Sequence, residues 1–296
     1  MKKIGMIGIG MMGHGIASNL IKHGWDLSVL EHPGNQSLTD LLAAGALTFN
    51  TPKKLAENSN VVILCVTGTP QVEAVLMGDE GVLQGLQAGS IVIDCSTAVP
   101  ASTDKVAQAV HAAGGRFLDA PMTRTPKEAA LGKLNLLVGG DDALFEQCKP
   151  ILSCFAENII HAGAVGAGHR MKLLHNYVSL GSVTLLAEAA ACAQRAGVDA
   201  QTFVDVLALG GGWGAALDRL KPYLATHDTS GLRFSMANAL KDLSYYNEMA
   251  LNTDADRTVS LAIQQTLESA CAEGDPQALL PEIVDRIAKR QHSPLA

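Results

Sequence analysis

The spacing of apolar residues divides the chain into two stretches. Up to about residue 161, short runs of apolar, β-prone residues alternate with amphipathic stretches. Such alternation predicts βαβ units around a mostly parallel sheet that has helices on both faces. The predicted strands are residues 4–7, 27–30, 61–66, 91–93, 117–118, 134–138 and 159–160.

From about residue 171 onward the apolar residues recur at helical spacing instead. Leu173, Leu174, Tyr177 and Leu180 open a long helical stretch, and later apolar stripes follow it. A chain of 296 residues is long enough for two domains, each with its own core. The predicted fold class is α/β, with an N-terminal Rossmann domain (a doubly wound parallel sheet) in residues 1–162 and a C-terminal all-α domain in residues 163–296.

A glycine-rich turn follows the first predicted strand directly. Residues 8–13 read Gly8-Ile9-Gly10-Met11-Met12-Gly13, and a helical pattern begins there, predicted from Gly13 to His23. A Gly-x-Gly-x-x-Gly turn between a strand and a helix points backbone N–H groups and the positive end of the helix dipole at a pyrophosphate. The turn therefore predicts that Gly8, Gly10, Met11, Met12 and Gly13 bind a dinucleotide.

An acidic residue ends the second predicted strand. Glu31 stands about 20 residues past the glycines, where a carboxylate accepts hydrogen bonds from the ribose hydroxyls and repels a 2′-phosphate. This position favours NAD over NADP. The alternative is a solvated carboxylate at a strand end, and nearby His32 and Lys22 weaken the preference for NAD.

The overall charge narrows the choice of partners. A net charge of −7 gives no electrostatic footprint for nucleic acid or for an anionic membrane, which favours a small-molecule partner. The most apolar later stretch, residues 178–191, is interrupted by Glu188 and is too short to span a bilayer. Because the N-terminus runs straight into the first strand without a signal sequence, we expect a cytoplasmic protein.

The six cysteines show no spacing typical of a metal site or a disulfide framework. We interpret them as small apolar residues in a reducing compartment and expect no metal.

One polar pair stands near the predicted domain junction. Lys172 and Asn176 are four residues apart, so on a helix they share one face and can address the same substrate oxygen. A lysine in a partly desolvated cleft has a lowered pKa, which suits proton exchange with an alcohol oxygen. The alternative is a solvated surface lysine beside an incidental asparagine.

Five blocks of sequence resemble the β-hydroxyacid dehydrogenase family, over nearly the whole chain. They are residues 7–13 with Ala17-Ser18-Asn19-Leu20 downstream, Ile93-Asp94-Cys95-Ser96-Thr97, Asp119-Ala120-Pro121, Gly166-x-Gly168-x-x-x-Lys172-x-x-x-Asn176, and Lys241-Asp242-Leu243. The resemblance implies NAD as cofactor, Lys172 as the general acid/base and Asn176 as the group that orients the substrate.

The same resemblance implies further contacts. Thr97 would reach the nicotinamide ribose or the substrate, and Val66 and Thr67 would line the adenosine side, although the family often has Leu-Pro there. Lys241 would reach the cofactor from the helical domain, and Asp242 would help to hold that lysine.

The chain departs from the family at residues 122–125. Most members have Ser-Gly-Gly where this chain has Thr123-Arg124-Thr125, and a guanidinium suits a carboxylate or a three-oxygen anion. The Arg-Thr pair resembles the sulfolactaldehyde reductases within the family. These three residues are therefore predicted to bind an anionic substrate.

Three further residues are candidates for substrate contact. His175 either donates to an anion, acts as a pH-sensitive group or packs beside Asn176, and Ser179 can complete the anion pocket. Trp213, in a glycine-rich break, either forms an apolar wall of the substrate site or is buried in the helical core.

The predicted function is NAD-dependent interconversion of a small 3-hydroxy acid, or a sulfonate analogue such as 2,3-dihydroxypropane-1-sulfonate, and its semialdehyde. The alternatives are a non-catalytic dinucleotide-binding scaffold and an imine reductase, which shares the architecture but tends to lack this lysine. Leu185, Ala189 and Cys192 give the long helix an apolar face, so we expect a homodimer or homotetramer.

Overall fold

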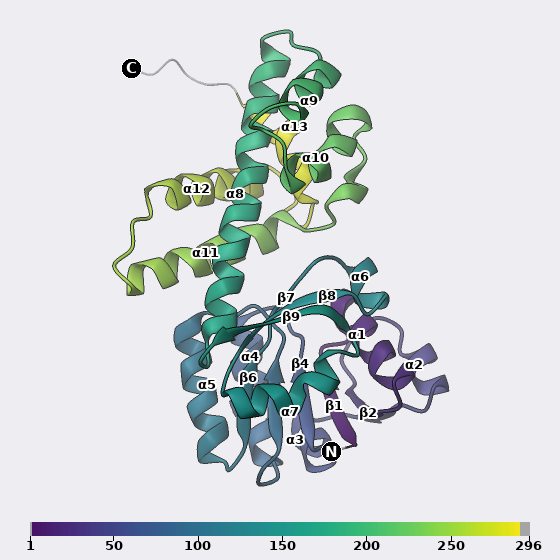
Figure 1. Cartoon of the computed structure of the whole chain (residues 1–296). Coiled ribbons are helices and arrows are strands. Elements are labelled where there is room, and N and C mark those ends of the chain that lie inside the picture. The colour runs from purple at the N-terminus through teal and green to yellow at the C-terminus, as the bar shows by residue number, and fades with distance from the viewer. Residues whose placement is uncertain (1, 291–296) are drawn as a thin grey trace. The chain divides into compact units, whose positions relative to one another are not determined.

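The structure, a computed structural model, describes residues 2–290 and divides into two compact units, Met1–Lys172 and Leu173–Ala296 (Figure 1). The elements of the first unit are β1 (Lys3–Ile7), α1 (Met11–Lys22), β2 (Asp26–Leu30), α2 (Thr39–Ala43), β3 (Leu47–Phe49), α3 (Pro52–Glu57), β4 (Val61–Leu64), α4 (Thr69–Met77), η1 (Val82–Gln84), β5 (Ile91–Asp94), α5 (Pro100–Ala112), β6 (Arg116–Asp119), β7 (Met122–Thr123), α6 (Pro126–Ala130), β8 (Leu134–Gly139), α7 (Asp142–Leu152) and β9 (Ala156–Gly163).

Nine strands of the described chain form one sheet in the first unit. Its order is β3-β2-β1-β4-β5-β6-β8-β7, and β9 pairs with β8. The strands from β3 to β6 are all parallel, whereas β8 runs antiparallel to β6 and β7. The chain leaves β1 toward β2 on one side and reaches β4 on the other, so the order reverses at β1. In open α/β sheets, ligands bind beyond the carboxyl ends of the strands at such a point.

The sheet is buried on both faces because its central strands are almost entirely apolar, and β4 is apolar at every position. On β4, Val61 and Ile63 pack into the core under α1 and α7, whereas Val62 and Leu64 face α3, α4 and α5. Figure 1 shows these two layers of helices on opposite sides of the strands. Full burial explains why the parallel strands have continuous apolar runs without polar alternation.

The predicted α/β class and its strands are confirmed, with local differences. The structure adds β3 and β7, which the sequence pattern did not predict, because each is very short and lies toward a sheet edge. Helix α1 begins at Met11, two residues before the predicted start at Gly13. Strand β4 ends at Leu64, which leaves Val66 in the loop that follows it.

Every helix or strand element described in the second unit, up to residue 290, is a helix, as predicted. Its elements are α8 (Ala167–Arg195), which begins in the first unit, α9 (Ala200–Ala208), α10 (Ala215–Thr226), η2 (Thr229–Gly231), α11 (Met236–Asn252), α12 (Thr258–Ala272), η3 (Leu280–Glu282) and α13 (Ile283–Lys289). In its core, Val183 on α8 packs with one residue from each of four later helices: Leu220 on α10, Leu243 on α11, Leu267 on α12 and Ile283 on α13. No helix in residues 2–290 combines the length and apolar character needed to cross a bilayer.

The compact units meet between Lys172 and Leu173, later than the predicted boundary after residue 162. The reason is local to the first unit: the first turn of α8 is bonded to the end of β6. Asp119 accepts hydrogen bonds from the N–H groups of Gly166 and His169, at 2.6 and 2.8 Å. These bonds attach the start of α8 to the sheet domain.

Candidate functional site

The glycine turn after β1 is shaped by close backbone contacts. A Cβ atom on Gly8 would overlap the carbonyl oxygen of Cys65, and one on Gly13 would overlap the carbonyl oxygen of Gly8. Gly8 also has a φ of +97°, a conformation that favours glycine. Gly10 differs, since a Cβ atom there would meet nothing within 4 Å. The turn therefore packs tightly at its first and third glycines and leaves space over its second.

The amino terminus of α1 has the features of an anion-binding site. Gly10 is its N-cap, no side chain caps it, and no acidic residue stands in its first turn. The backbone N–H groups of a helix start then face outward with the positive end of the dipole. Together with the space over Gly10, this cradle fits the pyrophosphate of a dinucleotide.

Glu31 follows β2 on the same edge of the sheet as the glycine turn. It is exposed, and it lines an open pocket of about 460 Å³ with His32, Pro33, Asn35, Gln36, Leu38 and Asn50. Asn35 joins this pocket to the turn: its Oδ1 accepts from Ile9 N–H at 3.3 Å and its Nδ2 donates to Leu30 O at 2.9 Å. The sequence analysis missed Asn35, although an asparagine after a strand and a Pro-Gly pair is a recognisable turn signal.

The ends of β4 and β5 are fastened to one another. Ser96 accepts a hydrogen bond from Val66 N–H at 3.0 Å, and its own N–H donates to Asp94 Oδ1 at 2.9 Å. Thr97 follows Ser96 directly and is partly buried, whereas Thr67 is exposed. Three of the predicted cofactor contacts, at positions 66, 67 and 97, thus stand on neighbouring strand ends.

Lys172 is partly buried, and its ammonium group is held within the first unit. Its Nζ donates a hydrogen bond to the carbonyl oxygen of Met122 in β7, at 2.7 Å. Lys172 is thus partly buried and hydrogen-bonded to the backbone, which differs from the alternative of a fully solvated lysine. The bond links Lys172 to the segment that carries the predicted anion-binding residues.

That segment, residues 123–125, contains a strained residue. Arg124 has a φ of +81°, which a non-glycine residue seldom adopts and which is concentrated at functional sites. Its Nη1 donates to Glu157 at 2.6 Å and to the carbonyl oxygen of Lys133. The hydrogen bond from Arg124 holds the pKa of Glu157 below its usual value.

The residues on either side of Arg124 form hydrogen bonds with nearby parts of the chain. Thr123 accepts a hydrogen bond from Asn135 at 3.1 Å across the β7–β8 pair. Thr125 is the N-cap of α6 and forms a capping box with Glu128. The two hydroxyls therefore order the loop on either side of Arg124.

A second polar cluster lies wholly within the helical unit. Asn176 donates from Nδ2 to Asp242 at 2.6 Å, and its Oδ1 accepts from His175 Nδ1 at 2.9 Å. Asp242 is buried at 3% exposure and forms an ion pair with Lys241 at 3.1 Å. Four residues that the sequence analysis named thus form one chain of contacts. Through Asp242, this chain fixes the amide orientation of Asn176.

The remaining two candidates, Ser179 and Trp213, differ in exposure. Ser179 is partly buried on α8, one turn after His175. Trp213 is 70% exposed, so the alternative of a tryptophan buried in the helical core is wrong.

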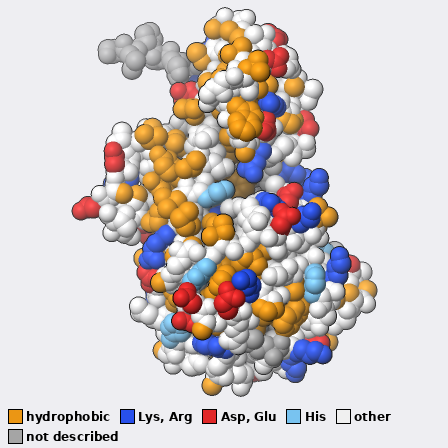
Figure 2. Space-filling view, viewed as in Figure 1, with side chains coloured by type: hydrophobic (Ala, Val, Ile, Leu, Met, Phe, Trp, Pro, Cys, Tyr) orange, Lys and Arg blue, Asp and Glu red, His pale blue; other side chains and the backbone are white. Residues whose placement is uncertain are grey.

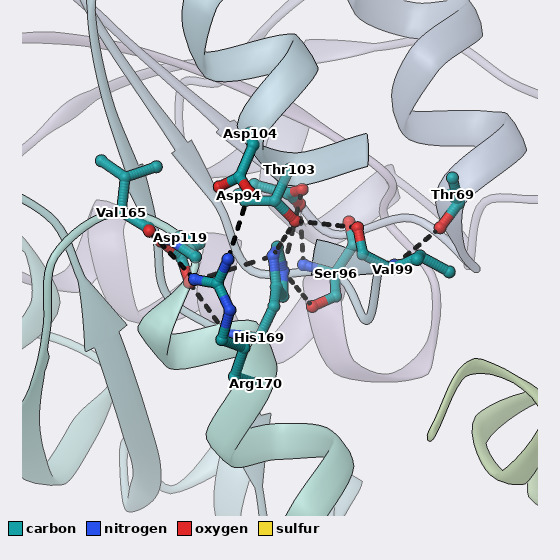
Figure 3. A network of polar contacts seen from close by, with 11 residues as sticks. Thr69, Asp94, Ser96, Val99, Thr103, Asp104, Asp119, Val165, His169 and Arg170 are labelled. Carbon is teal, nitrogen blue, oxygen red and sulfur yellow. Dashed lines mark hydrogen bonds and ion pairs between the residues drawn. The ribbon is translucent and has the colours of Figure 1, made fainter. Parts of the chain in front are cut away.

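A buried polar network under the carboxyl edge of the sheet was given no role from sequence (Figure 3). Its members Asp94, Asp119 and His169 are each 0% exposed. His169 contacts Thr103 Oγ1 at 2.8 Å and Ser96 O at 3.1 Å, and it lies 3.9 Å from a carboxylate oxygen of Asp94 and of Asp119. All three residues stand in motifs that the sequence analysis quoted, but only the fold brings these motifs together.

Burial changes the acid–base properties of this region. Desolvation raises the pKa of Asp94, and its Oδ2 has no hydrogen-bond partner among residues 2–290. Burial also raises the pKa of the Cys65 thiol to about 12. The Cys65 thiol is therefore protonated at neutral pH, and all six cysteines are free.

Comparison with known proteins assigns both halves of the chain to described families. Residues 3–163 match the NAD binding domain of 6-phosphogluconate dehydrogenase. Residues 166–285 match the family described as NAD-binding of NADP-dependent 3-hydroxyisobutyrate dehydrogenase.

Individual relatives cover most of the chain. It is 33% identical to NAD-dependent L-serine dehydrogenase of Pseudomonas aeruginosa, over 84% of this chain and 86% of that protein. It is 37% identical to 3-sulfolactaldehyde reductase of Escherichia coli, over 64% of this chain and 63% of that protein. A solved 3-hydroxyisobutyrate dehydrogenase of Mycobacterium tuberculosis with L-serine superposes with a TM-score of 0.85 at 25% identity, covering 97% of this chain and 99% of that one.

The contrast between Gly10 and Gly13 gives a matched pair of variants. Gly13→Ala should destabilise the fold by about 1–3 kcal/mol or more, because its methyl group overlaps backbone. Gly10→Ala should change stability by about 1 kcal/mol at most but weaken dinucleotide binding by roughly tenfold or more, because the methyl group fills the phosphate cradle. Urea unfolding and calorimetric titration with NAD measure the two effects. Undiminished binding by the Gly10→Ala protein would contradict the cradle.

The raised pKa of Asp94 predicts a pH dependence of stability. A carboxyl whose pKa is higher in the native state binds more protons there than in the unfolded chain. Its contribution is therefore largest below its unfolded pKa of about 3.9 and is lost as the pH rises through the native value. The substitution Asp94→Asn removes this pH-dependent loss of stability.

We expect the free energy of unfolding of Asp94→Asn, relative to wild type, to increase from pH 4 to pH 8. The increase should be about 1.4 kcal/mol for each unit by which the native pKa is raised. Urea unfolding across that range measures it. Asp119→Asn is the control and should lose stability at neutral pH, because it weakens two buried hydrogen bonds from backbone N–H groups. A difference for Asp94→Asn that stays constant or shrinks with pH would contradict the assignment.

Proposed function

Because this chain belongs to the β-hydroxyacid dehydrogenase family, we propose that it uses NAD to interconvert a small 3-hydroxy acid and its semialdehyde. The observation that carries the proposal is the Lys172 ammonium, bonded to Met122 O at 2.7 Å in the unit that also holds the glycine turn. An ammonium held at a defined point is what a general acid/base needs. NAD supplies the hydride acceptor for oxidation of the alcohol, and its reduced form supplies the hydride for the reverse direction.

The preference for NAD over NADP rests on Glu31. Its exposed carboxylate lines the open pocket after β2, beside the loop that Asn35 ties to the glycine turn. A carboxylate there accepts hydrogen bonds from the ribose hydroxyls and repels a 2′-phosphate. Backbone groups of the glycine turn hold the pyrophosphate, Val66 and Thr67 line the adenosine side, and Thr97 reaches the nicotinamide ribose or the substrate.

Lys172 exchanges the proton of the substrate oxygen. Its Nζ has a backbone carbonyl as one partner and is partly buried, so the ammonium is both oriented and shielded from bulk water. In the direction of oxidation the amine takes the hydroxyl proton as the hydride leaves the carbon. In the reverse direction the ammonium returns the proton to the aldehyde oxygen.

The substrate is an anion, and Arg124 is the group we assign to it. The guanidinium donates to Lys133 O and to Glu157 through Nη1, and a guanidinium presents donors on three nitrogens. Its partner within the chain, Glu157, is itself a carboxylate, which supports the assignment of an anionic ligand to this side chain. A carboxylate or a sulfonate, such as that of 2,3-dihydroxypropane-1-sulfonate, fits the same planar donor set, with Thr123 and Thr125 beside it.

The helical unit supplies the remaining groups of this proposal. Asn176 orients the substrate with its amide fixed by Asp242, and Lys241 contacts the cofactor. His175 and Ser179 add donors on α8. The exposed ring of Trp213 forms an apolar wall that limits substrate size.

Association into a homodimer or homotetramer is also part of the proposal. Leu185 is 70% exposed on α8, Val178 is 65% exposed, and Val259 on α12 is 62% exposed. Figure 2 shows hydrophobic side chains gathered over the face that carries α8, α11 and α12. A contiguous apolar surface of this kind is typical of a protein–protein interface.

Replacement of Lys172 tests the proposed reaction. Lys172→Ala should lower kcat by about a hundredfold or more while NAD binding stays nearly intact, because only the proton transfer is lost. Steady-state kinetics with small hydroxy acids and their semialdehydes measures kcat, and fluorescence titration with NADH measures binding. Turnover equal to wild type in this variant would refute the role of Lys172, and absence of NAD-dependent turnover in the wild type would argue for a scaffold protein instead.

Replacement of Arg124 tests the substrate class. Arg124→Gly should raise KM for anionic substrates by roughly 10- to 100-fold, the size expected for a lost hydrogen bond to a charged group. KM for neutral alcohols should stay close to that of the wild type. Because glycine adopts a φ of +81° without strain, the variant should remain folded, which its melting temperature checks. Equal effects on anionic and neutral substrates would exclude the anion-binding role.

A further inference from the structure

The ring of His169 is the only side chain in Figure 3 that reaches both the loop after β5 and helix α5 from helix α8. It is 0% exposed, so its polar atoms depend on protein partners alone. Lys172 lies one helical turn later on α8, and Thr97 directly follows Ser96, whose carbonyl oxygen the ring contacts.

The partners of the ring show which atoms its two nitrogens contact. Ser96 O can only accept, so Nε2 carries a proton and donates to it at 3.1 Å. Thr103 Oγ1 lies 2.8 Å from Nδ1 and 3.2 Å from Val99 O, so its hydroxyl links the ring to the start of α5. Carboxylate oxygens of Asp94 and Asp119 lie 3.9 Å from the ring nitrogens Nε2 and Nδ1, respectively.

The backbone around the ring is fixed as well. The N–H of His169 donates to Asp119 at 2.8 Å, and Ser96 is held by Val66 N–H and by Asp94. Three strand ends and the first turn of α8 therefore form one buried block. Within it, the Nε2 bond is the direct link between the segment that bears Thr97 and the helix that bears Lys172.

We propose that His169 is a positioning residue that sets Lys172 relative to the Thr97 loop through the hydrogen bond from Nε2 to Ser96 O. The inference rests on the proposed function, in which Lys172 exchanges the substrate proton. His169 touches neither cofactor nor substrate in this proposal. Its effect should therefore appear in kcat and leave KM for NAD unchanged.

Two substitutions separate the two ring nitrogens. The amide nitrogen of glutamine lies as many bonds from Cα as Nε2, and that of asparagine as many as Nδ1. His169→Gln can thus keep the bond to Ser96 O, whereas His169→Asn can keep only the bond to Thr103. Thr103→Val is the matched control, because it removes the partner of Nδ1 and leaves the Nε2 bond in place.

Kinetics of the three variants test the proposal. We expect His169→Asn to lower kcat by roughly 10- to 100-fold, the range in which small misplacements of a catalytic group fall, with KM for NAD within about twofold of wild type. His169→Gln and Thr103→Val should keep kcat within about threefold, even if their melting temperatures fall. Equal kcat in the Gln and Asn variants, or kcat that follows melting temperature across all three, would overturn the proposal.

A measurement without turnover separates this inference from the proposed function. Hydrogen exchange followed by mass spectrometry reports the protection of amides in residues 166–176 of the full chain. Faster exchange there in His169→Asn than in His169→Gln supports the positioning role, and equal exchange in the two contradicts it. If the wild type oxidises no hydroxy acid, the proposed function fails, while this exchange difference still decides whether His169 holds the start of α8.

Discussion

The carboxylate of Asp119 is the constraint on which the lysine-bearing helix depends. It ends β6, is fully buried, and accepts the N–H groups of Gly166 and His169 at the start of α8. Hydrogen bonds from helix N-termini to a carboxylate are charge-assisted and gain strength away from water. The fit leaves no room for change, because a Cβ atom on Gly139 or Gly168 would lie within 3 Å of this carboxylate. The position of the first turn of α8 on the sheet is thereby defined.

The network around Asp119 explains why polar groups are buried where an apolar core would be more stable. Asp94, Ser96, Thr103 and His169 are nearly or fully buried, and most of their polar atoms have partners. Burying charges is unfavourable unless their geometry is satisfied, and a satisfied network favours one arrangement over others. Here that arrangement aligns the ends of β4, β5 and β6 with the first turn of α8. These are the elements that carry the proposed contacts to cofactor and substrate.

In the proposed function, Arg124 adds specificity for an anionic substrate to this scaffold. Its positive φ is the backbone conformation that glycine adopts most readily. The side chain keeps that loop conformation and adds a charge, with Glu157 as its partner within the chain. Strain of this kind persists only where the surrounding structure enforces it, and the capping box at Thr125 and the bond at Thr123 supply that support. We interpret Arg124 as the residue that narrows a general hydroxyacid site to one class of anion.

The sequence by itself determined the elements whose signal is local. The glycine turn, the central strands and the all-helical second half follow from patterns within a few residues of each other, and the family resemblance follows from short blocks in order. The sequence also identified the four residues of the polar cluster in the second unit, which are His175, Asn176, Lys241 and Asp242. It did not indicate the contacts among them.

Only the tertiary structure decided which blocks meet. The short strands β3 and β7 form because neighbours in the sheet complete their hydrogen bonds, and a propensity pattern of two or three residues cannot indicate this. Asp94, Asp119 and His169 stand 25 or more residues apart along the chain, so their convergence is a product of parallel strand pairing and of the cap on α8. The contact of Lys172 with Met122 has the same origin. Sequence defined the residue types available for the chemistry, and the packing of α8 on the sheet determined their partners, because hydrogen bonds and burial depend on distance in space.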